Sequence, residues 1–153
     1  MRVTLSRRGD YAIRAMLALT EHDLGAAAEG LAGAATARGN GCLSARRIAD
    51  RMHIPAPFAA HVLRDLTRAG LLTASPGRHG GYRLASPPES ITVLRVVDAA
   101  DGRGAPPRCV LRGMPCDPDG RCAVHDTVAG ATQAARAAMD GTSMADLVRS
   151  ARR

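Results

Sequence analysis

Three of the four cysteines of this 153-residue chain share one short stretch with a histidine. They are Cys109, Cys116, Cys122 and His125, with six, five and two residues between them. Thiolates and imidazoles are soft ligands that suit zinc ions and iron–sulfur clusters. Glycines and prolines interrupt the stretch and permit the bending that would bring the four side chains around one centre.

The spacing alone leaves three chemistries open: an iron–sulfur cluster, a structural zinc ion, or thiols that are reduced or form a disulfide. Structural zinc sites commonly use cysteine pairs two to four residues apart, whereas the gaps here are wider, which favours the bulkier cluster. The chain shows neither a signal peptide nor a long apolar run. We therefore expect a cytoplasmic protein whose thiols stay reduced, with no membrane segment.

The charge of the chain favours a polyanionic partner. There are 21 basic against 14 acidic residues, a formal charge of +7, and every basic residue is an arginine. The planar guanidinium group suits phosphates and guanine edges. Charge alone does not show whether the partner is nucleic acid or an anionic membrane surface, and a high arginine content can also reflect the base composition of a genome.

The segment Leu43–Leu72 predicts two short helices joined by a tight turn. Ser44 is a good N-cap, and Pro55 ends the first helix because proline disfavours helix in the residue before it. Pro57 fits the first turn of the second helix, and Gly70 fits its C-terminal cap. The pattern indicates a helix-turn-helix, with a plain helical hairpin as the alternative.

Two short strands are predicted directly after this pair of helices. The sequences "LLTAS" and "YRLAS" flank the turn "PGRHGG", which has Arg78 and His79 at its tip and Gly80 beside them. Glycine lets the backbone approach a phosphate closely, and arginine can enter a minor groove. A hairpin after a helix-turn-helix is a winged helix, so we expect a mainly α fold with a small β-hairpin wing.

Helical patterns precede and follow the winged helix. Asp10–His22 has helical apolar spacing. The Ala- and Gly-rich segment Gly25–Gly41 could extend this helix with a frayed end, but its repeated glycines favour a flexible loop. Ser90–Gly102 predicts a helix that starts at a serine cap and returns to the core.

Beyond the cysteines, residues from about 125 to 140 predict a long helix, and Ser143 with Asp146 forms a capping box before a last helix. Small packing positions on the long helix are Val128, Ala131, Ala134 or Ala135, and Ala138.

Four segments together resemble one family. They are "RRGDYAIRAMLALT", "LSARRIADRMHIPAPFAAHVLRDLTRAGLL", "GRHGGYRLASPPESITVLRVVDAADG" and "CAVHDTV" before "TSMADL". They resemble the bacterial iron–sulfur winged-helix transcription regulators of the IscR and NsrR type, over nearly the whole chain apart from the 25–41 segment. The resemblance implies a winged helix-turn-helix over 1–102, a cysteine-rich cluster-binding loop over 103–125, and a dimerisation helix with a C-terminal helix over 126–153.

The resemblance also implies a ligand set. Cys109, Cys116 and Cys122 would hold an iron–sulfur cluster, with His125 as fourth ligand or, alternatively, Asp10 from the partner subunit. In the family a two-iron cluster goes with histidine and a four-iron cluster with aspartate, so the cluster type stays open. The other open alternative is a winged-helix regulator with a structural zinc site or a cysteine thiol switch.

The implied function is a homodimeric regulator of transcription, most simply a repressor, that binds a double-stranded DNA operator. Its cluster would control DNA affinity, and we expect no enzyme activity and no small-molecule substrate. The DNA-binding candidates are Arg7, Arg8, Ser44, Arg46, Pro57, His61, Arg64, Arg78, His79 and Gly80. The chain departs from the family at Ala59–Ala60, where many relatives carry larger, often acidic residues, and at Pro76, so the operator cannot be carried over.

Overall fold

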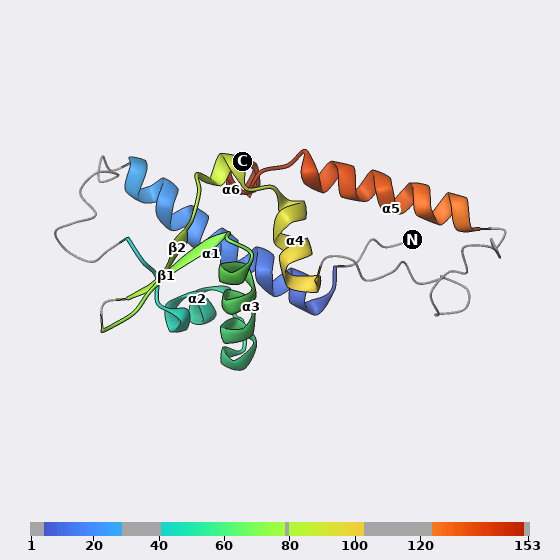
Figure 1. Ribbon diagram of the computed structural model, residues 1–153. Helices are drawn as coiled ribbons and strands as arrows, with labels where there is room; N and C mark the ends of the chain where they lie inside the picture. The colour runs from blue at the N-terminus through green and yellow to red at the C-terminus, as the bar shows by residue number, and fades with distance from the viewer. Residues whose placement is uncertain (1–4, 29–40, 79, 103–123, 152–153) are drawn as a thin grey trace.

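The computed structural model describes residues 5–28, 41–78, 80–102 and 124–151. The elements, in chain order, are α1 (Arg7–Ala28), α2 (Ala45–Met52), α3 (Ala56–Arg68), β1 (Leu72–Ser75), β2 (Gly81–Leu84), the 3₁₀ turn η1 (Pro88–Ser90), α4 (Val93–Asp101), α5 (His125–Asp140) and α6 (Met144–Ala151). Figure 1 shows a group of packed helices with the hairpin projecting on one side and α5 on the other. The expected mainly α fold with a β-hairpin wing is confirmed.

The helix-turn-helix forms as its caps predict. The Ser44 hydroxyl accepts a hydrogen bond from the backbone N–H of Arg47 at 3.3 Å and so caps α2. At the other end His53 has φ 52°, a left-handed conformation that stops the helix before Ile54 enters the core. Pro57 lies in the first turn of α3, where its missing N–H costs nothing.

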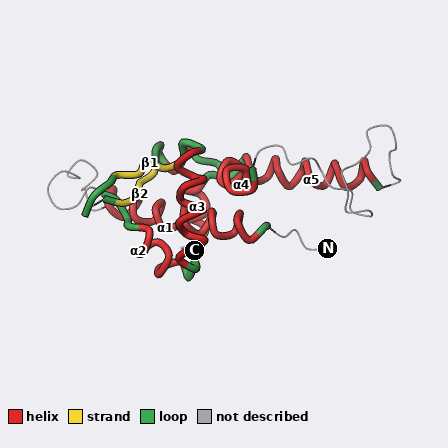
Figure 2. The backbone as a smooth tube through the Cα atoms, turned by 60° about the horizontal axis from the view of Figure 1, so that its bottom comes forward, coloured by secondary structure: helices red, strands yellow, loops and turns green. Residues whose placement is uncertain are grey.

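The wing is a two-stranded antiparallel sheet that is pinned to the start of the helix-turn-helix (Figure 2). β1 pairs with β2 in the register Leu72 to Leu84. Tyr82 also exchanges two backbone hydrogen bonds with Leu43, at 2.9 and 2.8 Å. A Cβ on Gly81 would lie 2.5 Å from the Leu43 carbonyl oxygen, so only glycine allows this close approach.

The core draws on both ends of the chain. α1 packs against α2, α3, α4 and α6, and α6 also contacts η1. The largest fully buried side chains are Met16, Leu19, Thr20, Ile48, Leu63, Leu66, Ile91, Val96, Met144 and Val148. The last helix therefore returns to the winged helix, although α5 separates the two in sequence.

Two sequence expectations about element boundaries were wrong. α1 continues through Ala28, so the start of the segment predicted as a loop is helical. Alanine favours helix strongly, and a single Gly25 costs only about 1 kcal/mol against that preference. The cap of α4 is Thr92, whose hydroxyl accepts from the N–H of Arg95 at 3.3 Å, whereas Ser90 lies in η1.

Candidate nucleic-acid interface

α3 presents one exposed face and buries the other. Its exposed ridge, with members three or four residues apart along the helix, consists of Pro57, Ala60, His61, Arg64 and Arg68. The opposite face is buried in the core through Ala59, Val62, Leu63 and Leu66. This amphipathic arrangement orients the ridge outward, as a helix that enters a DNA major groove requires.

Two ridge side chains are hydrogen-bonded to each other. The Arg64 guanidinium lies 2.7 Å from Nδ1 of His61, one helical turn before it. Both residues are DNA-binding candidates from the sequence, but the sequence pattern does not predict that they bind each other.

Arg8, another candidate, lies on α1 and forms an ion pair with α3. Its guanidinium donates to the Asp65 carboxylate at 2.6 Å, and Arg68 approaches that carboxylate at 3.6 Å. The Asp65 side chain is only 13% exposed, whereas Arg8 remains 58% exposed. Arg8 therefore attaches α1 to α3 and still offers donors to solvent.

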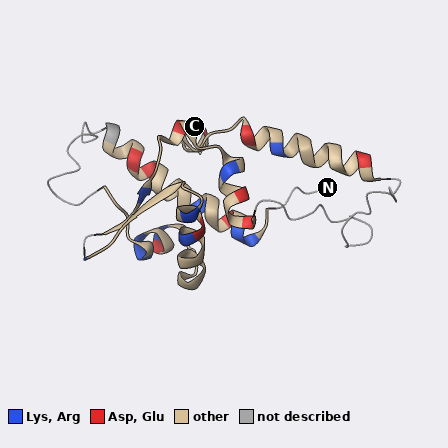
Figure 3. Ribbon diagram, in the orientation of Figure 1, with Lys and Arg blue, Asp and Glu red and all other residues tan. Residues whose placement is uncertain are grey.

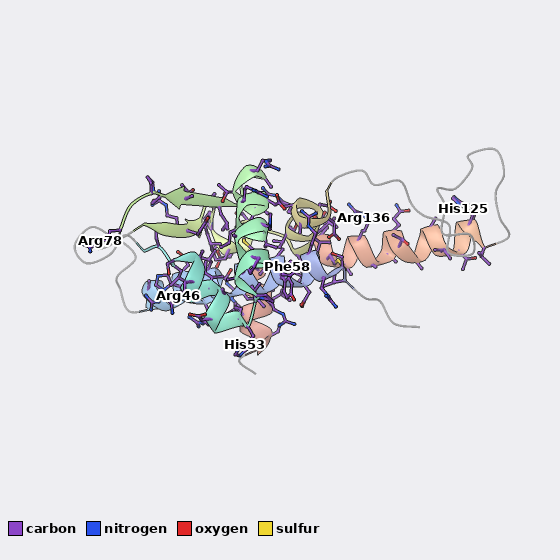
Figure 4. The ribbon with its side chains drawn as sticks, turned by 90° about the horizontal axis from the view of Figure 1, so that it is seen from below. Arg46, His53, Phe58, Arg78, His125 and Arg136 are labelled. Carbon is purple, nitrogen blue, oxygen red and sulfur yellow. The ribbon has the colours of Figure 1, made fainter. Side chains whose placement is uncertain are left out.

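The remaining candidates lie on α1, α2 and the wing. Arg7 is exposed, and Arg46 is 91% exposed with only a 3.7 Å approach to Asp50. Arg78 is exposed at the wing tip (Figure 4). The N–H of Gly80 donates to the Gly77 carbonyl at 3.0 Å and closes the wing turn. His79 lies outside the described residues.

Phe58 is a further candidate that was not among the residues predicted from the sequence. This ring is 45% exposed beside the ridge and packs against Tyr11 of α1, with ring centroids 5.6 Å apart and planes tilted by 49°. Its signal was present in the sequence: the chain's single phenylalanine directly follows Pro57. A large apolar side chain left at the edge of an exposed ridge is a candidate for contact with a partner.

The candidate metal ligands are only partly covered by the structure. Cys109, Cys116 and Cys122 lie outside the described residues. His125 is the first residue of α5, and the cap before it makes no side-chain capping hydrogen bond. Among the described residues alone, no three His, Cys, Asp or Glu side chains are placed to hold a metal ion.

Asp10, the alternative fourth ligand, has a local role in one chain. It lies in the first turn of α1, where a carboxylate complements the helix dipole. It also pairs with Arg14 one turn later, at 2.9 Å. These contacts account for Asp10 within one chain without a metal.

α5 is attached to the winged helix at one end and projects from it. Arg136 donates two hydrogen bonds to the Asp98 carboxylate of α4, at 2.9 and 2.8 Å, and this partner raises the pKa of the guanidinium. None of the described side chains of α5 is buried. Figure 3 shows a helix that carries few charges along its length, and Figure 4 shows His125 at the end remote from the domain.

Comparison with known proteins agrees with this architecture. Residues 5–150 match the family model Rrf2, described as iron-dependent transcriptional regulator. Protein rrf2 of Nitratidesulfovibrio vulgaris is 34% identical over 110 residues, which cover 71% of this chain and 73% of that protein. An rrf2-like regulator of Rhodobacter capsulatus is 38% identical over 77 residues, and the chain spans about half (51%) of its length.

Two solved structures share the fold. T. potens IscR superposes with a TM-score of 0.69 at 22% identity, covering 97% of this chain and 88% of the other. CymR, the global cysteine regulator of B. subtilis, has the same TM-score at 21% identity, covering 97% and 98%. None of the helices in the described ranges is long and apolar enough to cross a bilayer.

Proposed function

Because the chain belongs to the Rrf2 family of transcriptional regulators, we propose that it binds double-stranded DNA as a homodimer and that an iron–sulfur cluster controls its affinity. The family match makes the chain a regulator of transcription and not an enzyme. The observation that carries the DNA-binding mode is the exposed ridge of α3 within a winged helix.

The DNA contacts divide into three groups. The ridge of α3 enters the major groove and contacts base edges. Arg46 and the N-terminal Arg7 contact phosphates, which makes binding sensitive to salt. Arg78 at the wing tip reaches the neighbouring groove, where Gly80 keeps the turn tight.

The dimer forms through α5. An amphipathic or apolar helix needs a covered face, yet the described side chains of α5 are unburied in one chain. Its small residues Val128, Ala131, Ala135 and Ala138 follow a three-four spacing that suits close packing of two such helices. The Arg136–Asp98 ion pair joins this helix to α4 of the domain.

The donor set fits an iron–sulfur cluster. Three thiolates with a histidine at the start of α5 supply four soft ligands from one segment, 103–125, and its edge. A bound cluster would supply a group that oxidants, nitric oxide or loss of iron can alter. The choice between His125 and the partner subunit's Asp10 as fourth ligand decides between a two-iron and a four-iron cluster.

Control of DNA affinity then follows from linkage. The ligand segment joins α4 to α5, so a change in its conformation alters how α5 is held and how far apart the two recognition helices of a dimer lie. If one state of the cluster stabilises one dimer geometry more than another, DNA affinity shifts by the difference between these two stabilisation free energies. The same thiolates also suit a second candidate, a structural zinc site or a thiol switch in the same segment.

Anaerobic purification followed by a visible spectrum with iron, sulfide and zinc assays separates these candidates. Broad visible absorbance with acid-labile sulfide is expected for the cluster, and the iron count distinguishes the two cluster types. A colourless protein with one zinc, or with no metal after reconstitution, would replace the sensing half of the proposal and leave the DNA-binding half.

The functional test of sensing is Cys116→Ala. This variant should lose the response of DNA binding to oxidant, because one ligand is missing. Cys42→Ala is the matched control, since the Cys42 thiol is half-buried and lies 3.9 Å from the Ser75 hydroxyl, outside the ligand segment. Binding by Cys116→Ala that equals wild type with and without oxidant would end the sensing proposal.

A further inference from the structure

The polar groups on the outer face of α3 are limited in kind. Pro57 and Ala60 offer no side-chain polar atoms, so the ridge offers only His61, Arg64 and Arg68. Guanidinium groups donate hydrogen bonds and never accept them. Within the ridge, the imidazole is therefore the only side chain with an acceptor.

That acceptor is already used. Arg64 can only donate, so Nδ1 of His61 accepts across the 2.7 Å contact and carries no proton. The neutral ring then carries its proton on Nε2, which is a donor. Paired in this way, His61 and Arg64 present donors alone to a partner.

The nearest carboxylate does not change this. Asp65 is only 13% exposed and is bound by Arg8 at 2.6 Å and by Arg68 at 3.6 Å. The hydroxyl of Thr67 donates to the Leu63 carbonyl within the helix. No described side chain of α3 other than these offers an acceptor oxygen.

A surface that only donates matches one base. In the major groove guanine presents two acceptors, N7 and O6, whereas adenine presents the N7 acceptor beside an amino donor, cytosine presents an amino donor, and thymine presents one acceptor beside a methyl group. We infer that the hydrogen-bonded His61–Arg64 pair reads a guanine in each half-site of the operator and rejects adenine and cytosine. This inference rests on the proposed DNA binding and names the base that it selects.

The test starts from the purified protein in its DNA-binding state and a random duplex library. The expected selected sequence has a guanine at one position of each half-site. Replacing that guanine with 7-deazaguanine, which lacks the N7 acceptor, should weaken wild-type binding roughly tenfold, as should replacement with adenine.

The variants His61→Ala and Arg64→Ala then test whether these two side chains recognise the guanine. Both side chains are exposed, so the variants should fold as wild type does, which circular dichroism checks. Each should bind the guanine and 7-deazaguanine duplexes with nearly equal affinity. Arg46→Ala is the control: this α2 arginine is 91% exposed, and its loss should weaken both duplexes by the same factor.

Two results would overturn the inference while DNA binding stands. The first is wild-type protein that binds the guanine and 7-deazaguanine duplexes with equal affinity. The second is a preference for the guanine duplex that remains in both His61→Ala and Arg64→Ala. A library from which no duplex is bound at all would instead overturn the DNA-binding proposal and this inference with it.

Discussion

Several arginines of the winged helix are held by acidic side chains. Asp65 binds Arg8 and Arg68, and Glu21 binds Arg51 at 2.5 Å. The formal charge of +7 therefore overstates the donors that are free to meet phosphates. Exposed ion pairs contribute only about 0–1 kcal/mol, so some of these arginines can exchange a carboxylate for a phosphate, whereas weakly paired ones are available at once.

Arg46→Ala should reduce the salt dependence of DNA binding. The side chain is 91% exposed and its acidic neighbour is 3.7 Å away, so it can contact a phosphate and release one counterion. The negative slope of log affinity against log salt concentration should become shallower by about 1. Titrations at several salt concentrations measure this slope.

Arg51→Ala serves as the comparison, because its guanidinium is held by Glu21. Its slope should stay at the wild-type value. A slope for Arg46→Ala that equals the wild-type slope would show that Arg46 makes no phosphate contact.

Backbone hydrogen bonds join the wing to the segment before α2. Tyr82 and Leu43 exchange two hydrogen bonds across the bridge between β2 and the segment before α2. The absence of a Cβ at Gly81 permits that distance. The pairing of the wing with the segment before α2 therefore depends on one glycine.

Gly81→Ala should destabilise the fold by about 1–3 kcal/mol, since the new Cβ would push Leu43 away and weaken both hydrogen bonds. DNA affinity should fall as well, because the wing shifts. Urea unfolding measures the first effect. Gly25→Ala is the matched control: its Cβ would meet no atom within 4 Å, and helix propensity predicts a gain of about 0.5–1 kcal/mol.

The start of α6 contains the capping box that the sequence predicted. The Ser143 hydroxyl donates to Asp146 at 2.6 Å and accepts from the Asp146 N–H at 3.1 Å, and the Ser143 N–H donates to the same carboxylate. These hydrogen bonds favour the charged carboxylate and lower the pKa of Asp146 below its ordinary value of 3.8.

The lowered pKa of Asp146 predicts how stability changes with acid. A carboxyl whose pKa is lower in the folded state stabilises the fold above its unfolded pKa and loses that contribution as pH falls through the folded pKa. Wild type should therefore be more stable than Asp146→Asn above pH 3.8, and the gap should close below it. Thermal unfolding over this range measures the gap, and a constant gap would contradict the assignment.

At the scale of the whole molecule, α5 projects from the packed helices, and none of its described side chains is buried. α5 is fastened at its C-terminal end by Arg136 and by the Thr92–Asp140 hydrogen bond at 3.2 Å, while its other end extends away from the core (Figure 1). The proposed dimer would cover this helix and fix the distance between two recognition helices. DNA affinity and oligomeric state should consequently change together.

Ala131→Glu should weaken the dimer, because it buries a carboxylate in the stripe of small residues proposed as the interface. Gln133→Glu adds the same charge to an exposed position of α5 outside that stripe and should leave the dimer intact. Sedimentation over a range of concentrations measures both dissociation constants. If the two variants dissociate alike, α5 does not pair through this stripe.

The sequence by itself determined the local structure. The Ser44 cap, the capping box at Ser143, the hairpin turn and the start of α5 near His125 were all predicted, because caps and turns depend on residues a few positions apart. The spacing of buried side chains in α3 was readable for the same reason.

Only the tertiary structure decided which long-range partners these elements meet. No pattern within α3 shows that Arg8 reaches Asp65 from α1, or that Tyr11 packs against Phe58. Thr92 replaced Ser90 as the cap of α4 because the nearby chain pairs with the start of α6 through the Thr92–Ser143 bridge. Such contacts join residues far apart in sequence, and packing of the whole core, which no local signal encodes, selects them.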